Sequence, residues 1–245
     1  MTRYYAISGG ADSTAMVLLA HERGEDFEMV FADTGAELPE TLWLIPRLVR
    51  YVGKPLTVVS NGTFYAALAN YGFLLPGFAL RWCTRILKQE PQDRFFAKVG
   101  ECEVGIGIRA DEPKRGSQTG RKEQTFIYPL RDAGMGKADV LAFCEKHGLL
   151  SPAYAWRTNT SCFCCPFQRV RDWKGLMKHH PDLYALAEDW ENQSNVWGRA
   201  KGYGDTYRYT WHQSRDLKTL REMDERQLTL WDDDDTEEAC TICRW

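Results

Sequence analysis

Short apolar runs and segments of helical periodicity alternate along the first half of the chain. Four apolar runs predict buried strands: residues 3–8, 27–32, 56–60 and 104–108. Between them, positions with the period of a helix predict helices over residues 13–21, from Pro39 onward and over residues 84–96. Strands that alternate with helices predict an α/β fold, with a doubly wound, mostly parallel sheet that helices cover on both faces.

The pattern changes in the second half of the chain. Residues 111–122 are polar and rich in Gly, Lys and Arg, which is typical of a mobile loop over a site. After a predicted helix at 136–147 come a segment rich in cysteine and aromatic residues and helix-like stretches near 169–195 and 213–226. We therefore expect three parts: an α/β domain over residues 1–150, a mainly helical region with clustered cysteines over 151–230, and an acidic tail over 231–245.

Charge separates the tail from the rest of the chain. The net charge is −3, but six of the 34 acidic residues fall within residues 232–238. The remainder has 34 − 6 = 28 acidic and all 31 basic residues, so it is slightly basic. A slightly basic body permits a phosphate-rich partner. No apolar run is long enough to span a bilayer and no signal segment stands at the N-terminus, so we expect a cytoplasmic chain without a membrane partner.

A glycine loop joins the first predicted strand to the first predicted helix. The loop contains Ser8, Gly9, Gly10, Asp12 and Ser13. Glycines let a backbone approach phosphate oxygens, and free N–H groups at a helix start attract an anion. Asp12 would repel phosphate unless Mg²⁺ or an ordered hydrogen-bond network intervened. We interpret the segment as a phosphate-binding loop rather than an ordinary turn, and it is not of the Walker type, because no Gly-x-x-x-x-Gly-Lys-Ser/Thr motif occurs.

Further motifs follow this loop in a fixed order over residues 3–170. They are residues 31–35 (Phe-Ala-Asp-Thr-Gly) with Glu37 and 39–41, Trp82 to Arg85 with Lys88 and Pro91, Gly107 to Glu112, Tyr128 to Leu130, and Cys162 to Phe167. With these motifs the chain resembles the PP-loop ATP pyrophosphatases, in the branch similar to phosphoadenosine phosphosulfate reductases. Each motif is weak by itself, and together they are specific.

This resemblance implies both a fold and a chemistry. The fold is that of the adenine nucleotide alpha hydrolases, so residues 1–150 would be the PP-loop nucleotide-binding domain, with ATP and Mg²⁺ as cofactors. Enzymes with this loop split ATP between its α- and β-phosphates, adenylate a carbonyl-like oxygen and let a nucleophile, often sulfur, displace AMP. The residues to which the resemblance gives catalytic roles are Asp12, Cys83, Lys88 and Arg109.

Two strand ends complete the expected nucleotide site. By resemblance, Asp33, Thr34 and Gly35 at the end of the second strand hold the adenosine, while Gly107 and Arg109 lie at the end of the fourth strand, on the same sheet edge. Arg109 has the geometry for a two-pronged phosphate contact. The alternative for this arginine is a surface ion pair with a carboxylate two or three residues further on, at Asp111 or Glu112.

Cysteines supply the second chemistry. Cys162 and Cys165 have the two-residue gap with which two thiolates grip one metal or cluster, and Cys83 matches the family's cysteine before a helix. Three thiolates suit a 4Fe–4S cluster with one open iron, for which zinc is the alternative. The fourth zinc ligand would then be Cys164, Cys240 or Cys243. Cys164 is otherwise a close neighbour of the ligands, and Cys102 and Cys144 are expected to be buried, inert thiols.

Three functions are consistent with these features. The first is ATP-dependent adenylation followed by sulfur transfer, with nucleic acid as the favoured acceptor and with a sulfur-donor protein and a homodimer as further partners. Nucleic acid is favoured because basic residues cluster near an aromatic residue, an arrangement that suits a phosphate backbone and stacked bases. The alternative interpretation of these basic residues is a solvated, charged helix face. The residues are Lys114, Arg115, Arg121, Lys122, Arg169, Arg171, Lys174 and Lys178, with Trp173. The second is sulfonucleotide reduction, against which stands the lack of the family's terminal Glu-Cys-Gly motif. The third is a non-catalytic nucleotide-binding subunit.

Overall fold

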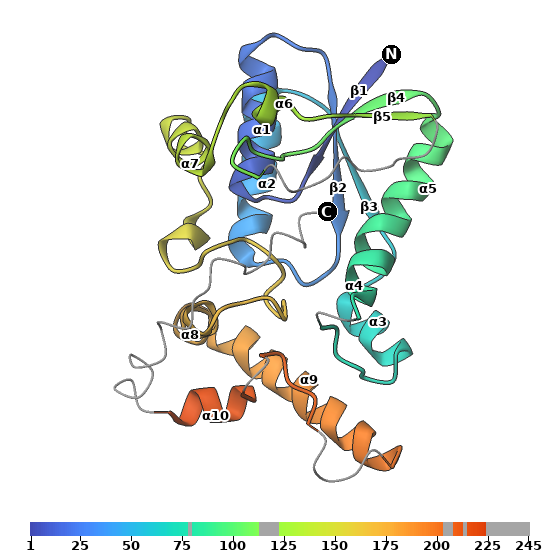
Figure 1. The fold of residues 1–245 in the computed structure, drawn as a ribbon, viewed down its shortest axis with the longest axis vertical. Coiled ribbons are helices and arrows are strands. Elements are labelled where there is room, and N and C mark those ends of the chain that lie inside the picture. The colour runs from blue at the N-terminus through green and yellow to red at the C-terminus, as the bar shows by residue number, and fades with distance from the viewer. Residues whose placement is uncertain (78–79, 113–122, 203–207, 213–214, 224–245) are drawn as a thin grey trace.

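Five parallel strands form one sheet at the centre of the computed structural model, which describes residues 1–77, 80–112, 123–202, 208–212 and 215–223 (Figure 1). The strands are β1 (Thr2–Ile7), β2 (Glu28–Asp33), β3 (Leu56–Ser60), β4 (Cys102–Gly105) and β5 (Gln124–Ile127). They lie in the order β3-β2-β1-β4-β5, and every neighbouring pair is parallel. The predicted doubly wound sheet is therefore confirmed.

Two apolar layers sandwich this sheet. Alternate residues of β1 point to opposite faces, so Tyr5 packs with the layer of α1 (Ala11–Glu22), α2 (Pro39–Val52) and α7 (Lys137–Lys146). Its neighbour Tyr4 packs on the other face against Phe96 of α5 (Glu90–Val99). The short helix α6 (Pro129–Asp132) adds Leu130 to the layer of α1. The short helices α3 (Phe64–Asn70) and α4 (Trp82–Thr84) lie towards the C-terminal region, and their buried side chains belong to its core (Figure 1).

The predicted helix over residues 84–96 is longer than expected and not uniform. It runs from α4 through a π-helical turn, η1 (Arg85–Gln89), into α5. A π turn holds an extra residue and is frequent at functional sites. Lys88 lies in this turn, and its side chain reaches the cavity described below.

The C-terminal region is helical, as expected, and has its own core. It contains a short 3₁₀ turn, η2 (Pro152–Ala155), and the helices α8 (Val170–His179), α9 (Pro181–Ala200) and α10 (Leu217–Glu222). Pro181 breaks the predicted stretch 169–195 into α8 and α9. Large buried side chains, among them Trp173, Trp190 and Trp211, fill this core together with Phe64 of the α/β part.

One surface expectation is wrong. Trp173 is buried at 1 % exposure, so it does not stand among the basic residues of α8 as a platform for stacking bases. Its helical position faces the core because the apolar stripe of α8 includes Leu176 as well. The predicted loop residues 113–122 and the acidic tail 231–245, with Cys240 and Cys243, lie outside the described residues.

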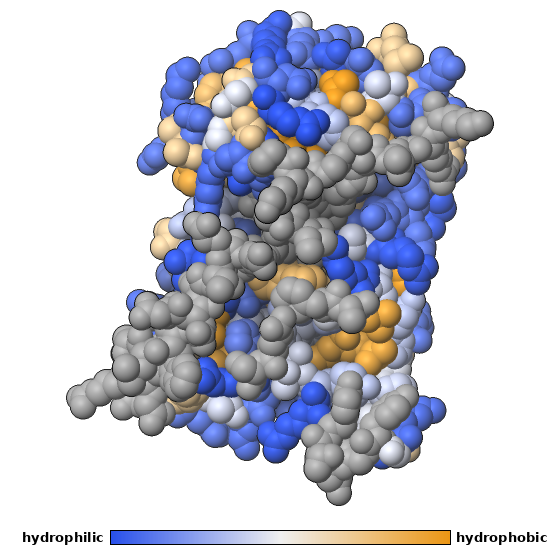
Figure 2. Space-filling view, viewed as in Figure 1, coloured by the Kyte–Doolittle hydropathy of each residue, from blue (hydrophilic) through white to orange (hydrophobic). Residues whose placement is uncertain are grey.

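The surface seen in Figure 2 is mainly hydrophilic over the α/β part. An apolar patch interrupts it in the lower half of the view, on the side of α3 and α4. Two large exposed apolar side chains belong to this stretch of chain, Tyr65 and Leu80. Within the described ranges, no helix combines the length and apolar character needed to cross a membrane.

Candidate functional site

The phosphate loop leaves β1 and turns at once into α1, which starts at Ala11, two residues before its predicted start. Gly9 has φ +73°, a left-handed conformation that favours glycine, and a Cβ atom there would lie 2.6 Å from Thr41 Cγ2 at the start of α2. The sharp turn therefore needs glycine for its conformation and for its packing.

Hydroxyl groups fix the shape of the loop. The Ser8 amide donates to Ser13 Oγ at 3.1 Å, and Ser13 Oγ donates to the Gly10 carbonyl at 3.0 Å. The first helical amide, Ala11 N–H, donates to Tyr154 Oη at 2.9 Å. Tyr154 comes from the C-terminal region, so that region closes over the helix start where an anion would bind.

Asp12 is neutralised by an arginine rather than left facing the loop as a bare charge. Both of its carboxylate oxygens accept from Arg109 Nη1 at 3.1 Å. The same guanidinium donates from Nε to Asp111 at 2.8 Å, and its Nη2 lies 3.3 Å from Glu112. This is the ordered network that Asp12 requires, and it includes both ion pairs considered above as the alternative for Arg109. Arg109 is only 7 % exposed, and its contact with phosphate stays a prediction.

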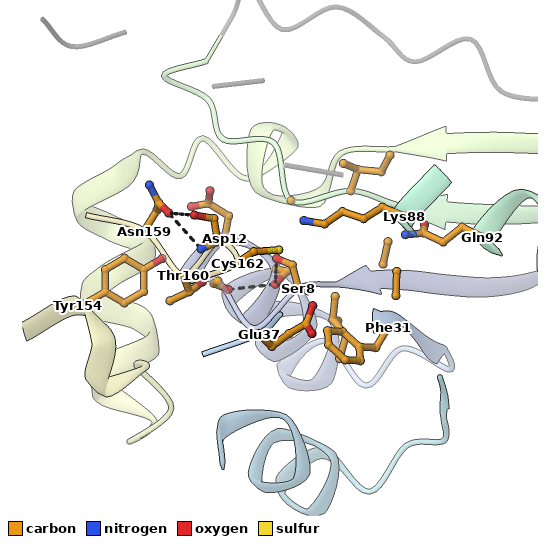
Figure 3. Close-up of a pocket in the computed structure, with 18 residues that line it drawn as sticks. Ser8, Asp12, Phe31, Glu37, Lys88, Gln92, Tyr154, Asn159, Thr160 and Cys162 are labelled. Atoms are coloured by element: carbon orange, nitrogen blue, oxygen red, sulfur yellow. Dashed lines mark hydrogen bonds between the residues drawn. The ribbon is translucent and has the colours of Figure 1, made fainter. Parts of the chain in front are cut away.

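A cavity of about 100 Å³ opens at the carboxyl ends of β1, β2 and β4 (Figure 3). Ligands of parallel α/β sheets bind at this edge, where the strand order reverses around β1. Lys88 and Gln92 reach it from one side, and Tyr154, Asn159 and Thr160 from the opposite side (Figure 3). Its wall also includes Ser161, Phe31 and Glu37.

The structure gathers part of the predicted nucleotide site around this cavity. Of the predicted residues, those that line it are Ser8, Gly10, Asp12, Ser13, Lys88, Gly107 and Cys162. Gly9 and Arg109 lie outside this wall, Gly9 within the loop and Arg109 bound to Asp12. Asp33, Thr34 and Gly35 are not part of the wall either, and they form a turn in which Gly35 N–H donates to Asp33 Oδ1 at 2.9 Å. Roles of Asp33, Thr34 and Gly35 in adenosine binding stay predictions.

Sequence reasoning missed the wall contributed by residues 154–161. Hydroxyl and amide side chains recur there without a helical or strand period, so no local signal marks them. Glu37 also lines the cavity, and the sequence marks it only as part of the motif that begins at residues 31–35. Burial raises its pKa, while hydrogen bonds from the Thr34 hydroxyl at 2.6 Å and the Thr34 amide lower it.

A second, smaller cavity of about 20 Å³ joins the three predicted metal ligands. Cys83, Cys162 and Cys165 all line it, together with Thr34 and Pro166. Thr34 Oγ1 lies 3.5 Å from Cys162 Sγ. Three residues, Lys88, Ser161 and Cys162, line both cavities, so the cysteine site adjoins the phosphate-loop site.

The donors at the second cavity fit a sulfur-rich anionic group. The thiols of Cys83, Cys162 and Cys165 and the ammonium group of Lys88 line it. In the part of the chain that the structure describes, no three His, Cys, Asp or Glu side chains are grouped around a single ion position. Cys164 is completely buried and belongs to the helical core. The predicted burial of Cys102 and Cys144 is confirmed, and burial raises the pKa of Cys144 to about 12.

Comparison with known families gives one match. Residues 2–127, just over half of the chain, match the sequence model of the phosphoadenosine phosphosulfate reductase domain.

Two relatives from Methanocaldococcus jannaschii align with most of this chain. Uncharacterized protein MJ0066 is 26 % identical over 210 residues, which is 82 % of this chain and 43 % of the relative. Uncharacterized protein MJ0973 is 31 % identical over 188 residues, 73 % of this chain and 45 % of the relative. The chain thus spans less than half the length of both.

Among solved structures, phosphoadenylyl-sulfate reductase from Candida auris in its phosphate complex has a similar fold. The TM-score is 0.50 at 16 % sequence identity, and the similarity covers 63 % of this chain and 77 % of the reductase. At this identity the similarity concerns the fold alone.

Proposed function

The chain belongs to the phosphoadenosine phosphosulfate reductase domain family, and from that premise we propose that it is an enzyme that cleaves ATP to AMP and pyrophosphate in order to thiolate a nucleic acid. The observation that carries this proposal is the wall shared by the two cavities. Lys88, Ser161 and Cys162 face both the phosphate loop and the cysteine site, so an activated acceptor and a sulfur source would meet without a long transfer.

The phosphate loop would serve the first step. An acceptor carbonyl oxygen attacks the α-phosphorus of ATP, the bond between the α-phosphorus and the bridging oxygen breaks, and pyrophosphate leaves. Ser8, Ser13 and the loop amides would hold the phosphates, and the Lys88 ammonium would offset the charge that develops on them. With Asp12 held by Arg109, Mg²⁺ bound to the phosphates would supply the remaining positive charge.

The cysteine site would serve the second step. Cys83, Cys162 and Cys165 would hold a 4Fe–4S cluster, which would supply an open iron for a sulfide. Sulfur then attacks the adenylated carbon, the carbon–oxygen bond breaks, and AMP leaves with the acceptor oxygen. A sulfur-donor protein and a homodimeric assembly belong to the same proposal.

Anaerobic turnover tests this proposal. The chain is incubated with Mg²⁺, sulfide, total cellular RNA or DNA, and ATP labelled with ³²P at the α-phosphate, and products are separated by thin-layer chromatography. We expect labelled AMP and thiolated nucleosides by mass spectrometry, both lost in Ser13→Ala and in Cys162→Ala. Labelled ADP as the product, or AMP without any thiolated nucleoside, would contradict it.

Sulfonucleotide reduction is the second candidate, because residues 2–127 match the phosphoadenosine phosphosulfate reductase domain family. It requires an adenylyl sulfate substrate and an external dithiol as reductant. Thioredoxin-dependent release of sulfite from phosphoadenylyl sulfate, with no pyrophosphate from ATP, would favour this function over ATP-dependent thiolation.

A further inference from the structure

Gln92 is a polar side chain at a helix position that normally holds an apolar one. It lies in the first turn of α5, four residues after Lys88 and four residues before Phe96. Phe96 packs against Tyr4 on one face of the sheet. A helix stripe with this spacing is usually apolar where it covers a sheet. Gln92 is nevertheless only 6 % exposed, so its carboxamide is held in a buried place.

The carboxamide of Gln92 is not satisfied by the residues that the structure describes. Its oxygen, Oε1, is buried and has no hydrogen-bond partner among them. An unsatisfied buried carbonyl costs free energy, and in a cavity wall it calls for a bound partner. Gln92 lines the phosphate-loop cavity and points into it from α5 (Figure 3). The last torsion of a glutamine is broad, so the carboxamide can turn both its oxygen and its NH₂ group toward a ligand there.

Small apolar side chains lie in front of this carboxamide. Ala6 and Ala32 follow Tyr4 and Val30 by two residues along their strands, so they lie on the same face of the sheet, one step nearer its carboxyl edge. Gln92 precedes the partner of Tyr4 on α5 by one helical turn. Both alanines and Gln92 line the phosphate-loop cavity. The sheet thus offers a flat apolar floor beside a carboxamide.

This part of the cavity lies apart from both the phosphate loop and the cysteine site. Gln92 reaches the cavity on the side opposite Tyr154 and Asn159 (Figure 3). It does not line the cysteine cavity. A nucleotide whose phosphates occupy the loop at Ser8 and Ser13 would therefore direct its base toward Gln92. A base has apolar faces and a polar edge, which match the alanine floor and the carboxamide.

The chemistry of a carboxamide favours adenine over guanine. Adenine presents an N6 amino donor next to the acceptor N7, and glutamine pairs with both at once. Guanine presents two acceptors on the same edge, O6 and N7, which suit arginine or lysine instead. We propose that Gln92 is a specificity-determining residue that pairs with the amino edge of adenine and so selects ATP. This inference rests on the nucleotide site of the proposed function, and it goes further in assigning the choice of base to one residue.

Calorimetric binding measurements test this role. Affinities for ATP, for GTP and for purine riboside 5′-triphosphate, which differs from ATP only in lacking the 6-amino group, are measured with Mg²⁺ and without acceptor or sulfide. The variants are Gln92→Leu and Gln92→Met, which keep a side chain of similar size. The control is Gln193→Leu, whose exposed glutamine on α9 bonds Asp189. Urea denaturation should show Gln92→Leu to be at least as stable as the wild type, because the unsatisfied oxygen is gone.

We expect the wild type and Gln193→Leu to bind ATP at least about tenfold more tightly than either other nucleotide. In Gln92→Leu and Gln92→Met the three affinities should lie within about threefold of one another, through a loss of ATP affinity. A merely structural role would weaken all three nucleotides equally and keep their ratios. Wild-type ratios in both Gln92 variants, or a wild type that binds the three nucleotides equally, would overturn the role of Gln92 and leave the nucleotide site in place. A wild type that binds none of them would refute the nucleotide site itself, and this role with it.

Discussion

Gly107 offers a direct probe of how the chain after β4 supports the phosphate loop. A Cβ atom at Gly107 would lie 2.9 Å from the Asp12 carbonyl carbon and 3.1 Å from the Ser13 amide nitrogen. Carbon atoms in good contact are roughly 3.5 Å apart or more, so the added methyl group would be about 0.6 Å too close. Because the opposing atoms are backbone, no side-chain rotation relieves the contact, and the phosphate loop must move.

We therefore expect Gly107→Ala to lower the free energy of unfolding by about 1–3 kcal/mol, the usual cost of overpacking. Displacement of the loop should also weaken ATP binding about tenfold, which corresponds to about 1.4 kcal/mol. Urea denaturation followed by circular dichroism measures the first effect, and isothermal titration calorimetry with a non-hydrolysable ATP analogue measures the second.

Gly77→Ala is the matched control, because none of the residues that the structure describes lies within 4 Å of a Cβ built at Gly77. Its unfolding free energy should stay within about 0.5 kcal/mol of the wild type. If Gly107→Ala had the wild-type urea midpoint and the wild-type affinity for the analogue, the close approach between Gly107 and the loop would not constrain nucleotide binding.

Three further predictions concern stability and reactivity. Burial raises the pKa of Glu191 from its ordinary 4.5 to about 7. Because the folded chain binds this proton more tightly than the unfolded chain, protonation of Glu191 contributes fully to the free energy of unfolding below about pH 4.5, and this contribution is lost as the pH rises through 7. Relative to Glu191→Gln, the wild type should gain up to about 3 kcal/mol in unfolding free energy between pH 7.5 and pH 4.5, and a difference independent of pH would contradict this. Asp172→Ala leaves the amide and hydroxyl donors of Thr158 without their acceptor and should lower the free energy of unfolding in urea by about 2–5 kcal/mol, whereas the exposed Asp26→Ala should leave the midpoint unchanged. Because burial raises the pKa of Cys144 to about 12, N-ethylmaleimide should modify it at least about 100-fold more slowly than the half-buried Cys83 at pH 8, and equal rates in peptide mass spectrometry would contradict its burial.

Local patterns predicted much of the fold. Apolar runs and the glycine loop depend on residues close in sequence, so β1 to β4 and the start of α1 were placed within a few residues. β5 was missed because it is a four-residue edge strand, Gln124–Ile127, with only a short apolar stretch. The position of β5 beside β4 depends on hydrogen bonding between these two strands, and the pattern of apolar residues along the chain does not predict which strands pair.

The site was predictable where it lies on strand ends and not where distant segments meet. The contact of Ala11 with Tyr154 spans 143 residues, and that of Arg109 with Asp12 spans 97. Sequence analysis could name Asp111 as a neighbour of Arg109, but not the third carboxylate that arrives from the phosphate loop.

The most direct test of the account concerns the wall shared by its two sites. Cys162 lines both cavities, whereas Cys83 lines only the cysteine cavity. Apoprotein is treated with N-ethylmaleimide with and without α,β-methylene-ATP and Mg²⁺, and the labelling rate of each cysteine is read by peptide mass spectrometry. A nucleotide bound at the phosphate loop should slow labelling of Cys162 at least about tenfold while Cys83 keeps its rate. Equal labelling of Cys162 with and without saturating nucleotide would contradict the claim that the nucleotide and cysteine sites adjoin.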